Sequence, residues 1–176
     1  EPLNVVIIGA FDDWTTAFTR RGYRYQVLNP RYAFGRAQDI SGVKINRGYT
    51  KAHPHTIRLW QTPIRYDGKP VWVGQTSVRL GGRFADKAPL GMTLPLNPNL
   101  DEARDDLIQD LAYSQALIKI GFIKGSRRPQ QAQKAGSSKD TQYTTDGLRA
   151  VLVFGDRPGS LEEIDFFNWE RIYDYR

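Results

Sequence analysis

The sequence feature that most constrains the fold is a hairpin pattern between residues 57 and 80. Two runs, Ile57 to Tyr66 and Lys69 to Leu80, are rich in β-branched and aromatic residues and flank the pair Asp67-Gly68. Asp-Gly favours the two-residue type I′ turn, whose twist matches that of antiparallel strands. The pattern therefore predicts two paired strands, with Tyr66 opposite Lys69.

This turn also sets an expected register and a shared face. Counting back from it pairs Trp60 with Gln75 and Arg58 with Ser77. Because alternate residues of a strand point to the same side, these four side chains are predicted to share one face of the sheet. Prolines within both runs cannot donate ladder hydrogen bonds, so we expect the tip of the hairpin at a sheet edge.

Two helices are expected to pack on the sheet. Asp12 can cap a helix over 11–22, whose Trp14 and Phe18 would face a buried strand formed by the apolar run at residues 3–8. A second helix over 99–115 opens with Asn99 and Glu102 at capping-box spacing. Its apolar stripe is expected to be buried and comprises Leu100, Ala103, Leu107 and Leu111. Its charged residues are expected to point largely outward, namely Arg104, Asp105, Asp106 and Asp110.

The remaining segments complete an α+β prediction. Runs over 116–123 and 148–154 read as further strands, giving a mixed, mainly antiparallel sheet with two or more helices packed against it. The 176 residues fit a single domain spanning 1–176. The polar stretch at about 126–142 is predicted to be a mobile loop. The aromatic tail at about 160–176 is expected either to pack back as an amphipathic helix or to dock on a partner.

Composition excludes several classes of function. The chain has no cysteine, which removes disulfides, thiolate zinc sites and cysteine nucleophiles. No apolar run approaches the roughly 20 residues that span a bilayer, so no transmembrane segment is predicted. The net charge of +6 permits an anionic partner. We favour a solvated basic surface, because the basic residues concentrate in two groups and the second lies partly in a segment predicted to be mobile. The aromatic and basic residues match no nucleic-acid-binding motif, so nucleic acid is not an expected partner.

The best candidate for a ligand site is an anion pocket around the hairpin. Arginines can clamp an anion, Trp60 can stack on it, and amide and hydroxyl groups can donate hydrogen bonds. The predicted ligand-binding residues are Arg36, Arg58, Trp60, Gln75 and Ser77. The competing interpretation is an ion pair from Arg58 to Asp39 or Asp101 that ties a loop to the sheet.

Catalytic and metal-binding signals are weak. The candidates for acid–base work are His55, Asp39 and Asp101. His53 and His55 have H-x-H spacing, which permits zinc chelation, but no cysteine or further histidine exists to complete the site. No Gly-x-Ser-x-Gly elbow is present. We therefore predict no metal and no cofactor, and we lean against an enzyme.

Four pieces of the chain, in this order, resemble the C-terminal domain of LssY-like bacterial proteins. They are Tyr32-Ala33-Phe34-Gly35-Arg36-Ala37-Gln38-Asp39; His55-Thr56-Ile57-Arg58-Leu59-Trp60 with Val71-Trp72-Val73-Gly74; Thr93 to Asp105; and Tyr143-Thr144-Thr145-Asp146-Gly147. With the opening strand and helix, the resemblance covers most of residues 3 to 154. The resemblance implies a domain that is often an appendage to membrane proteins carrying DedA-like or lipid-phosphatase-like segments. It has a loose link to secretion and an unassigned molecular activity.

The chain departs from the family pattern at its polar positions. Thr56 stands where the family has the second histidine of a pair, Leu94-Pro95 aligns with another histidine pair, and Arg79 stands where an aspartate usually follows the Trp-Val-Gly segment. The resemblance thus implies a retained fold with altered or lost chemistry.

From this resemblance we expect a non-catalytic accessory or interaction domain of a bacterial envelope- or membrane-associated protein. Membrane association or the cell envelope is favoured over the free cytoplasm, and the expected partner is a protein or another envelope component. One alternative is a hydrolase or binding site for a phosphorylated or otherwise anionic small molecule, centred on His55, Arg58 and Asp39. A weaker alternative is a basic module for nucleic acid or anionic lipid.

Overall fold

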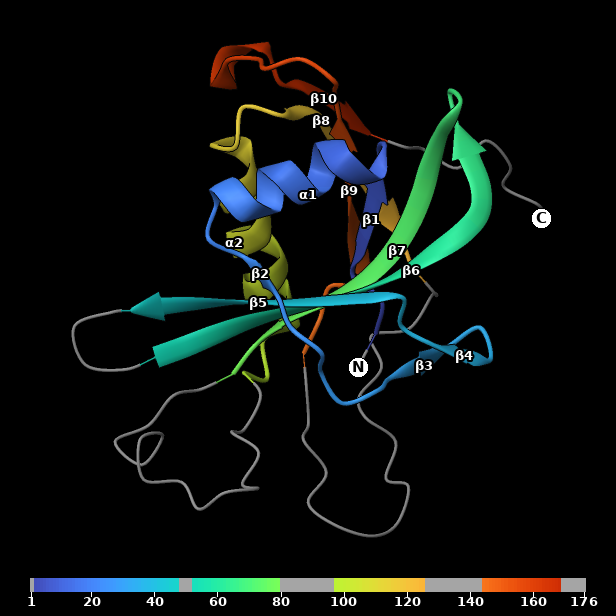
Figure 1. The fold of residues 1–176 in the computed structure, drawn as a ribbon, viewed down its shortest axis with the longest axis vertical. Helices are drawn as coiled ribbons and strands as arrows, with labels where there is room; N and C mark the ends of the chain where they lie inside the picture. The colour runs from blue at the N-terminus through green and yellow to red at the C-terminus, as the bar shows by residue number, and fades with distance from the viewer. Residues whose placement is uncertain (1, 48–51, 80–96, 126–143, 169–176) are drawn as a thin grey trace, which may run out of the picture.

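Eight strands and two helices form the main body of the chain. The computed structural model describes residues 2–47, 52–79, 97–125 and 144–168 (Figure 1). The strands of the main sheet are β1 (Val5–Ile8), β2 (Arg24–Tyr25), β5 (Ile40–Arg47), β6 (Ala52–Tyr66), β7 (Lys69–Val78), β8 (Leu117–Lys124), β9 (Leu148–Phe154) and β10 (Asp165–Asn168). A small second sheet pairs β3 (Tyr32–Ala33) with β4 (Arg36–Ala37).

The main sheet is mixed, with antiparallel pairs in the majority. Its order is β10-β8-β9-β1-β7-β6-β5-β2. Strand β1 lies inside the sheet, antiparallel to β7 and parallel to β9. The pair β10/β8 is also parallel, and every other neighbouring pair is antiparallel. This arrangement confirms the predicted α+β class.

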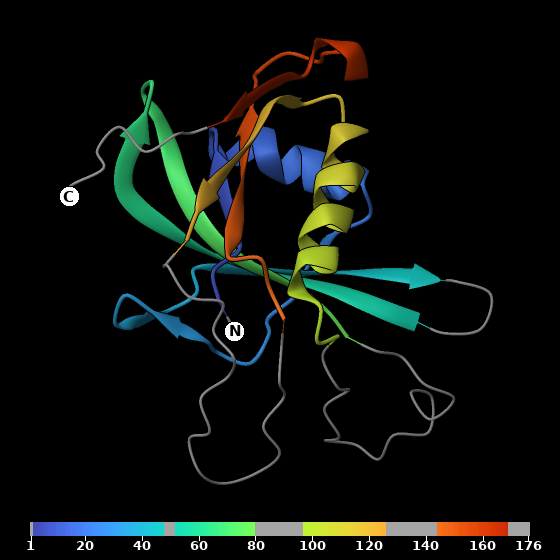
Figure 2. The ribbon, with the colours of Figure 1, turned by 180° about the vertical axis from the view of Figure 1, so that it is seen from behind.

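Both helices, α1 (Phe11–Arg20) and α2 (Leu100–Ala112), cover the same face of the sheet (Figures 1 and 2). Trp14 and Phe18 of α1 are buried, as predicted, and so is the α2 stripe. The two helices share one apolar cluster with inward-facing residues of the central strands, including Val5, Ile7, Leu152 and Phe154. Burial of this face provides most of the driving force for folding.

The two helix N-termini differ in how they are capped. The N-cap of α1 is Ala10, without a side-chain hydrogen bond, so the prediction of Asp12 as the cap was wrong. Asp12 lies within the first turn, where its charge still complements the helix dipole. Asn99 caps α2 as predicted and accepts hydrogen bonds from two amides of the first turn. The Glu102 carboxylate accepts a hydrogen bond from Asn97 Nδ2 at 2.9 Å.

The β6–β7 hairpin has the predicted turn but a different register. Both turn residues have positive φ, 49° at Asp67 and 75° at Gly68, as a type I′ turn requires. The register then shifts between Gln61 and Arg65, so that Arg58 pairs with Gln75 rather than Ser77, and Trp60 with Val73. The predicted pairs were therefore wrong by two residues. Proline within this stretch cannot donate to the ladder, which explains the irregularity.

Because the shift is an even number of residues, it moves no side chain to the other face. Arg58, Trp60, Gln75 and Ser77 therefore share one face, as predicted. This face is opposite to the one that the helices cover, since Ile57 and Leu59 belong to the helix-facing cluster.

The C-terminal segment forms no amphipathic helix in its described part. Residues Leu161–Glu163 make a single 3₁₀ turn, and β10 then adds a parallel strand beside β8. The rest of the predicted tail, 169–176, lies outside the described residues, as does the predicted loop at 126–142.

Candidate functional site

The predicted ligand-binding residues of the hairpin form a buried polar face. Arg58, Gln75 and Ser77 are each at most 4% exposed, and Trp60 is 1% exposed. Thr56 Oγ1 lies 2.9 Å from Ser77 Oγ in a hydrogen bond on this face. Four of the five predicted residues are thus brought together, within a layer that is closed to bulk water.

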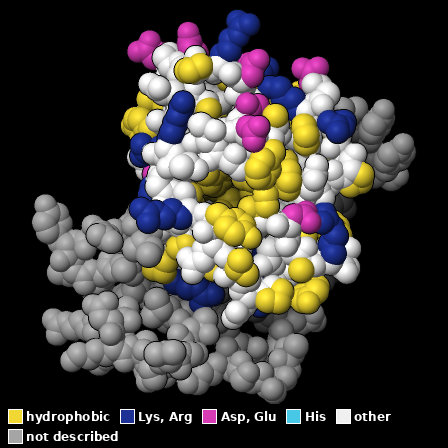
Figure 3. All heavy atoms as spheres, viewed as in Figure 1, with side chains coloured by type: hydrophobic (Ala, Val, Ile, Leu, Met, Phe, Trp, Pro, Cys, Tyr) yellow, Lys and Arg dark blue, Asp and Glu magenta, His cyan; other side chains and the backbone are white. Residues whose placement is uncertain are grey.

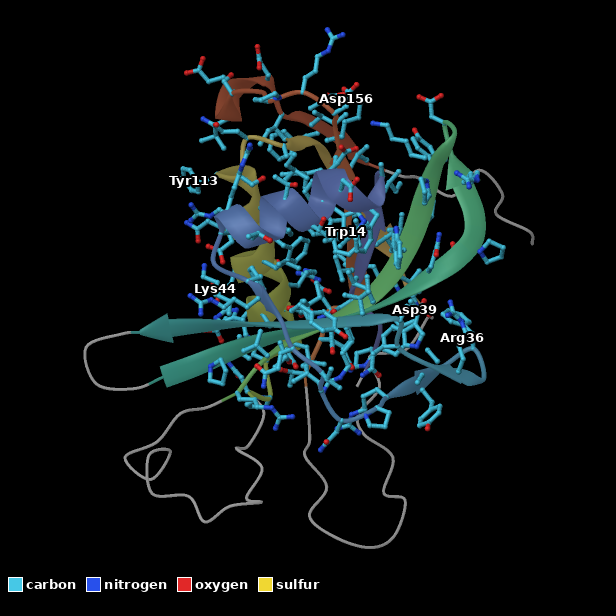
Figure 4. All side chains as sticks on the ribbon, viewed as in Figure 1. Trp14, Arg36, Asp39, Lys44, Tyr113 and Asp156 are labelled. Atoms are coloured by element: carbon cyan, nitrogen blue, oxygen red, sulfur yellow. The ribbon has the colours of Figure 1, made fainter. Side chains whose placement is uncertain are left out.

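The fifth residue, Arg36, lies at the margin of this face. Its carbonyl oxygen accepts a hydrogen bond from Trp60 Nε1 at 3.3 Å. Its guanidinium forms an ion pair with Asp39 and donates to the carbonyl oxygen of Gln61. Asp39 in turn accepts a hydrogen bond from the Gln61 amide at 2.6 Å. Through these contacts Arg36 and Asp39 hold β4 against β6, just before the register shift that begins at Gln61. Figure 4 shows the two side chains close together there.

The three catalytic candidates lie in three separate places. His55 is three residues from Arg58 on the same strand, so it faces the helices while Arg58 faces away from them. Asp39 belongs to the clip with Arg36. Asp101 lies in the first turn of α2, where it accepts hydrogen bonds from Thr145 Oγ1 at 2.9 Å and from the amide of residue 146 at 2.6 Å. Each of these three side chains is held in a different set of contacts.

His55 is instead part of a charged layer between β5, β6 and α2. Its Nε2 lies 3.8 Å from Asp106 Oδ2. Lys44, its neighbour across the ladder, forms an ion pair with Asp110, which also contacts Arg21 at 3.5 Å. Figure 4 shows Lys44 toward the end of β5 away from Asp39. These side chains fasten α2 to the sheet.

Burial perturbs two acids in this layer. The pKa of Tyr23 is raised, first by burial of its hydroxyl and then by the charges of Asp110 and Asp106. The pKa of Asp106 is also raised, mainly by burial, against a lowering effect of His55. The Tyr23 hydroxyl therefore stays neutral in this layer.

The outward orientation predicted for Asp110 was therefore wrong, whereas the Asp106 side chain, 48% exposed, is only partly turned inward. The two carboxylates are four residues apart on α2 and thus on one side of the helix, and that side faces Lys44 and His55. The four-residue spacing of Asp106 and Asp110 could be seen in the sequence. The sequence did not show which strands α2 would cross.

A second network joins α2 to the turn before β9. Arg104, predicted to point outward, is 4% exposed and donates two hydrogen bonds to Asp146, at 2.8 and 3.1 Å. It also contacts Asp101 and Asp105 at 3.3 and 3.0 Å. Burial alone would raise the pKa of Asp146, but the hydrogen bonds from Arg104 and the amide of residue 148 outweigh it, so the pKa is lowered. This network holds the start of α2 against residues 144–148.

An exposed apolar segment runs from β2 to the turn between β3 and β4. Tyr25, Val27, Tyr32 and Phe34 are 74%, 78%, 73% and 68% exposed. Aromatic side chains are enriched at protein interfaces, because they bury a large area at a small entropic cost. We call this set of four residues the aromatic segment. Sequence reasoning missed it, although four large apolar side chains among polar neighbours were visible there.

Phe34 has an unusual backbone conformation at the tip of the β3–β4 hairpin. Its φ is 54° and that of Gly35 is 74°, close to the values at Asp67 and Gly68. Glycine, asparagine and aspartate adopt this region readily, whereas a bulky residue there is an outlier. Phe34 thus exposes its phenyl ring to water while its backbone adopts a conformation that is unfavourable for phenylalanine.

Residues 23–148 match the model of the family described as LssY C-terminus. No curated protein and no solved structure matches the chain. Neither helix in the described ranges has the length and apolar character needed to cross a membrane. Among the same residues, no group of three or more His, Asp or Glu side chains is arranged to hold a metal ion.

Proposed function

This chain belongs to the LssY C-terminus family, and from that premise we propose that it is a non-catalytic interaction domain of a bacterial envelope- or membrane-associated protein. The partner is a protein or another component of the envelope. It docks on the aromatic segment, Tyr25, Val27, Tyr32 and Phe34, with Phe34 at the centre of the contact.

The single observation that carries this proposal is the state of Phe34. Its phenyl ring is 68% exposed, so it contributes little to the core. Its backbone lies in the left-handed region, which costs a non-glycine residue roughly 1–2 kcal/mol. A residue that strains the fold without packing into it is best explained by a contact outside the chain, because local strain concentrates at functional sites.

The dispersal of the catalytic candidates also supports a non-catalytic role. Acid–base catalysis needs groups that reach the same substrate atoms within hydrogen-bonding distance. His55, Asp39 and Asp101 each hold a different pair of structural elements together. The alternative, a hydrolase or a binding site for an anionic small molecule centred on His55, Arg58 and Asp39, would need His55 and Arg58 to act from opposite faces of β6.

A quantitative capture experiment tests the proposal. The immobilised chain is exposed to detergent-solubilised membranes of the bacterium that encodes it, and a retained component is identified by mass spectrometry and purified. Its affinity is then measured for the wild type, for Phe34→Asn and for Tyr113→Ser. Tyr113 is also exposed but lies at the end of α2, well away from β4 (Figure 4).

We expect Phe34→Asn to weaken binding at least tenfold, a typical loss for an aromatic anchor, while Tyr113→Ser binds like the wild type. Equal binding by all three proteins would contradict the proposal. Turnover of a phosphorylated compound by the wild type, lost in His55→Ala, would replace it with the hydrolase alternative.

A further inference from the structure

Residues 24–28 form one edge of the main sheet. Strand β2 is the last strand in the sheet order and lies beside β5 (Figure 1). The chain stays on β5 beyond the end of β2, because the Gln26 amide donates to the Ser41 carbonyl oxygen at 3.1 Å. The Leu28 amide then donates to Ser41 Oγ at 3.2 Å. The even-numbered residues of this edge therefore direct their amides toward β5.

The main-chain groups of Tyr25 and Val27 point the other way. Amide and carbonyl groups alternate in direction along an antiparallel strand, so those of the odd-numbered residues face away from the sheet. No segment within the described ranges pairs with them. Residues 24–28 also contain no lysine or proline, the residues that often protect an exposed edge from pairing. This edge is therefore open to a further strand.

The two sides of this edge differ in chemistry. Tyr25 pairs with Gly42, and Gly42 pairs with Ile57 of the helix-facing cluster, so the Tyr25 side chain lies on the helix side. Arg24 pairs with Val43 and lies on the opposite side. It is exposed and forms no ion pair with the described residues. The edge thus offers apolar side chains on one side and a positive charge on the other.

An apolar pocket lies beside the edge on the helix side. It has a volume of about 350 Å³ and opens between α1 and the strands β2, β5 and β6. Figure 3 shows it as a hollow with hydrophobic side chains around and within it. Tyr25 and Gly42 line it, so the pocket reaches the edge strand. Protein interiors are close-packed and seldom leave voids of this size, so the pocket can receive an incoming apolar side chain.

We propose that the partner docks on this edge by β-strand addition, through an extended segment in which apolar and acidic residues alternate. Its backbone pairs with Tyr25 and Val27, one apolar side chain enters the pocket, and acidic side chains lie beside Arg24. In this mode of recognition, main-chain hydrogen bonds supply affinity and alternate side chains supply specificity. The inference rests on the interaction role proposed above for the aromatic segment, to which Tyr25 and Val27 belong.

Fluorescence anisotropy with a synthetic peptide tests the proposal. The probe is Glu-Val-Glu-Leu-Glu-Val-Glu, and replacing its leucine with alanine should weaken binding about tenfold or more, because the leucine side chain is buried. Arg24→Glu should reverse the charge preference, so that a lysine-for-glutamate peptide binds about two- to fivefold tighter than the glutamate peptide. Arg157→Glu makes the same change in net charge at an exposed position after β9 and should keep the wild-type preference.

Hydrogen exchange of single amides, followed by NMR, separates strand addition from docking through side chains alone. The amides of Tyr25 and Val27 should exchange fast in the free chain and lose this fast exchange when the peptide is bound. N-methylation of one alternating set of peptide amides should abolish binding, whereas N-methylation of the other set should preserve it. These peptide changes leave the protein untouched, so they decide the question even if Arg24→Glu does not fold.

Three results would overturn the proposal: no binding of the glutamate peptide at millimolar concentration, fast exchange of the Tyr25 and Val27 amides in the complex, or an unchanged charge preference in folded Arg24→Glu. If Phe34→Asn still weakens binding of the captured envelope component, such a result rejects strand addition alone. Equal binding of that component by Phe34→Asn would reject the proposed interaction role, even where the peptide binds at the edge.

Discussion

Replacing Phe34 by asparagine should make the chain more stable. Asparagine tolerates the left-handed backbone that phenylalanine pays roughly 1–2 kcal/mol to adopt, and Asn-Gly is a preferred type I′ pair. The phenyl ring is 68% exposed, so its removal forfeits only about a third of the 1.5–3 kcal/mol that full burial contributes. We therefore expect Phe34→Asn to raise the free energy of unfolding by about 0.5–1 kcal/mol.

Urea unfolding, followed by circular dichroism, measures this change as a shift of the midpoint at constant slope. The β6–β7 turn supplies a matched control, because Asp67 and Gly68 have nearly the same φ values as Phe34 and Gly35. The reverse change there, Asp67→Phe, should lower stability by about 1 kcal/mol. If Phe34→Asn instead destabilised the chain by 1 kcal/mol or more, the phenyl ring would stabilise the fold itself, and its exposure would no longer indicate an external contact.

Two further changes test the packing and the buried network. Gly74→Ala should destabilise the fold by roughly 1–3 kcal/mol in a thermal or urea melt. A Cβ at position 74 would lie 2.5 Å from Leu59 Cδ2 and 2.8 Å from Val5 Cγ1. An unchanged midpoint would contradict this prediction and show that these side chains move aside without cost. Asp146→Asn should cost about 1–2 kcal/mol at pH 7, because it weakens the hydrogen bonds to buried Arg104. The folded-state pKa of Asp146 is lowered, so this contribution is present above the unfolded pKa of about 4 and is lost as the pH falls through the folded pKa. A stability gap between wild type and Asp146→Asn that widened on acidification would contradict that sign.

Local patterns in the sequence predicted much of the fold. The Asp67-Gly68 turn, the α2 cap at Asn99 and the apolar stripes of both helices depend on residues near one another in the chain, and each was predicted correctly. The shared face of Arg58 and Ser77 was also predicted correctly. The register shift did not affect it, because a shift of two residues preserves the alternation of side chains along a strand.

The errors concern contacts between distant segments. Arg104 is buried because Asp146, 42 residues later, lies beside it, and α2 crosses the strands at Lys44 and His55. Neither contact follows from helical periodicity. The strand β10 lies in a tail whose aromatic residues suggested a helix or a docking element. By contrast, strand alternation already separates His55 from Arg58, so the sequence itself held the information that the two face opposite sides.

The proposed contact between Phe34 and an envelope component can be tested most directly by photo-crosslinking. A benzoylphenylalanine placed at position 34 and one placed at position 113 are compared in membranes of the encoding bacterium, followed by mass spectrometry of the products. The account predicts a defined envelope component linked at position 34 and absent at position 113. No product at position 34, or the same products from both positions, would contradict it.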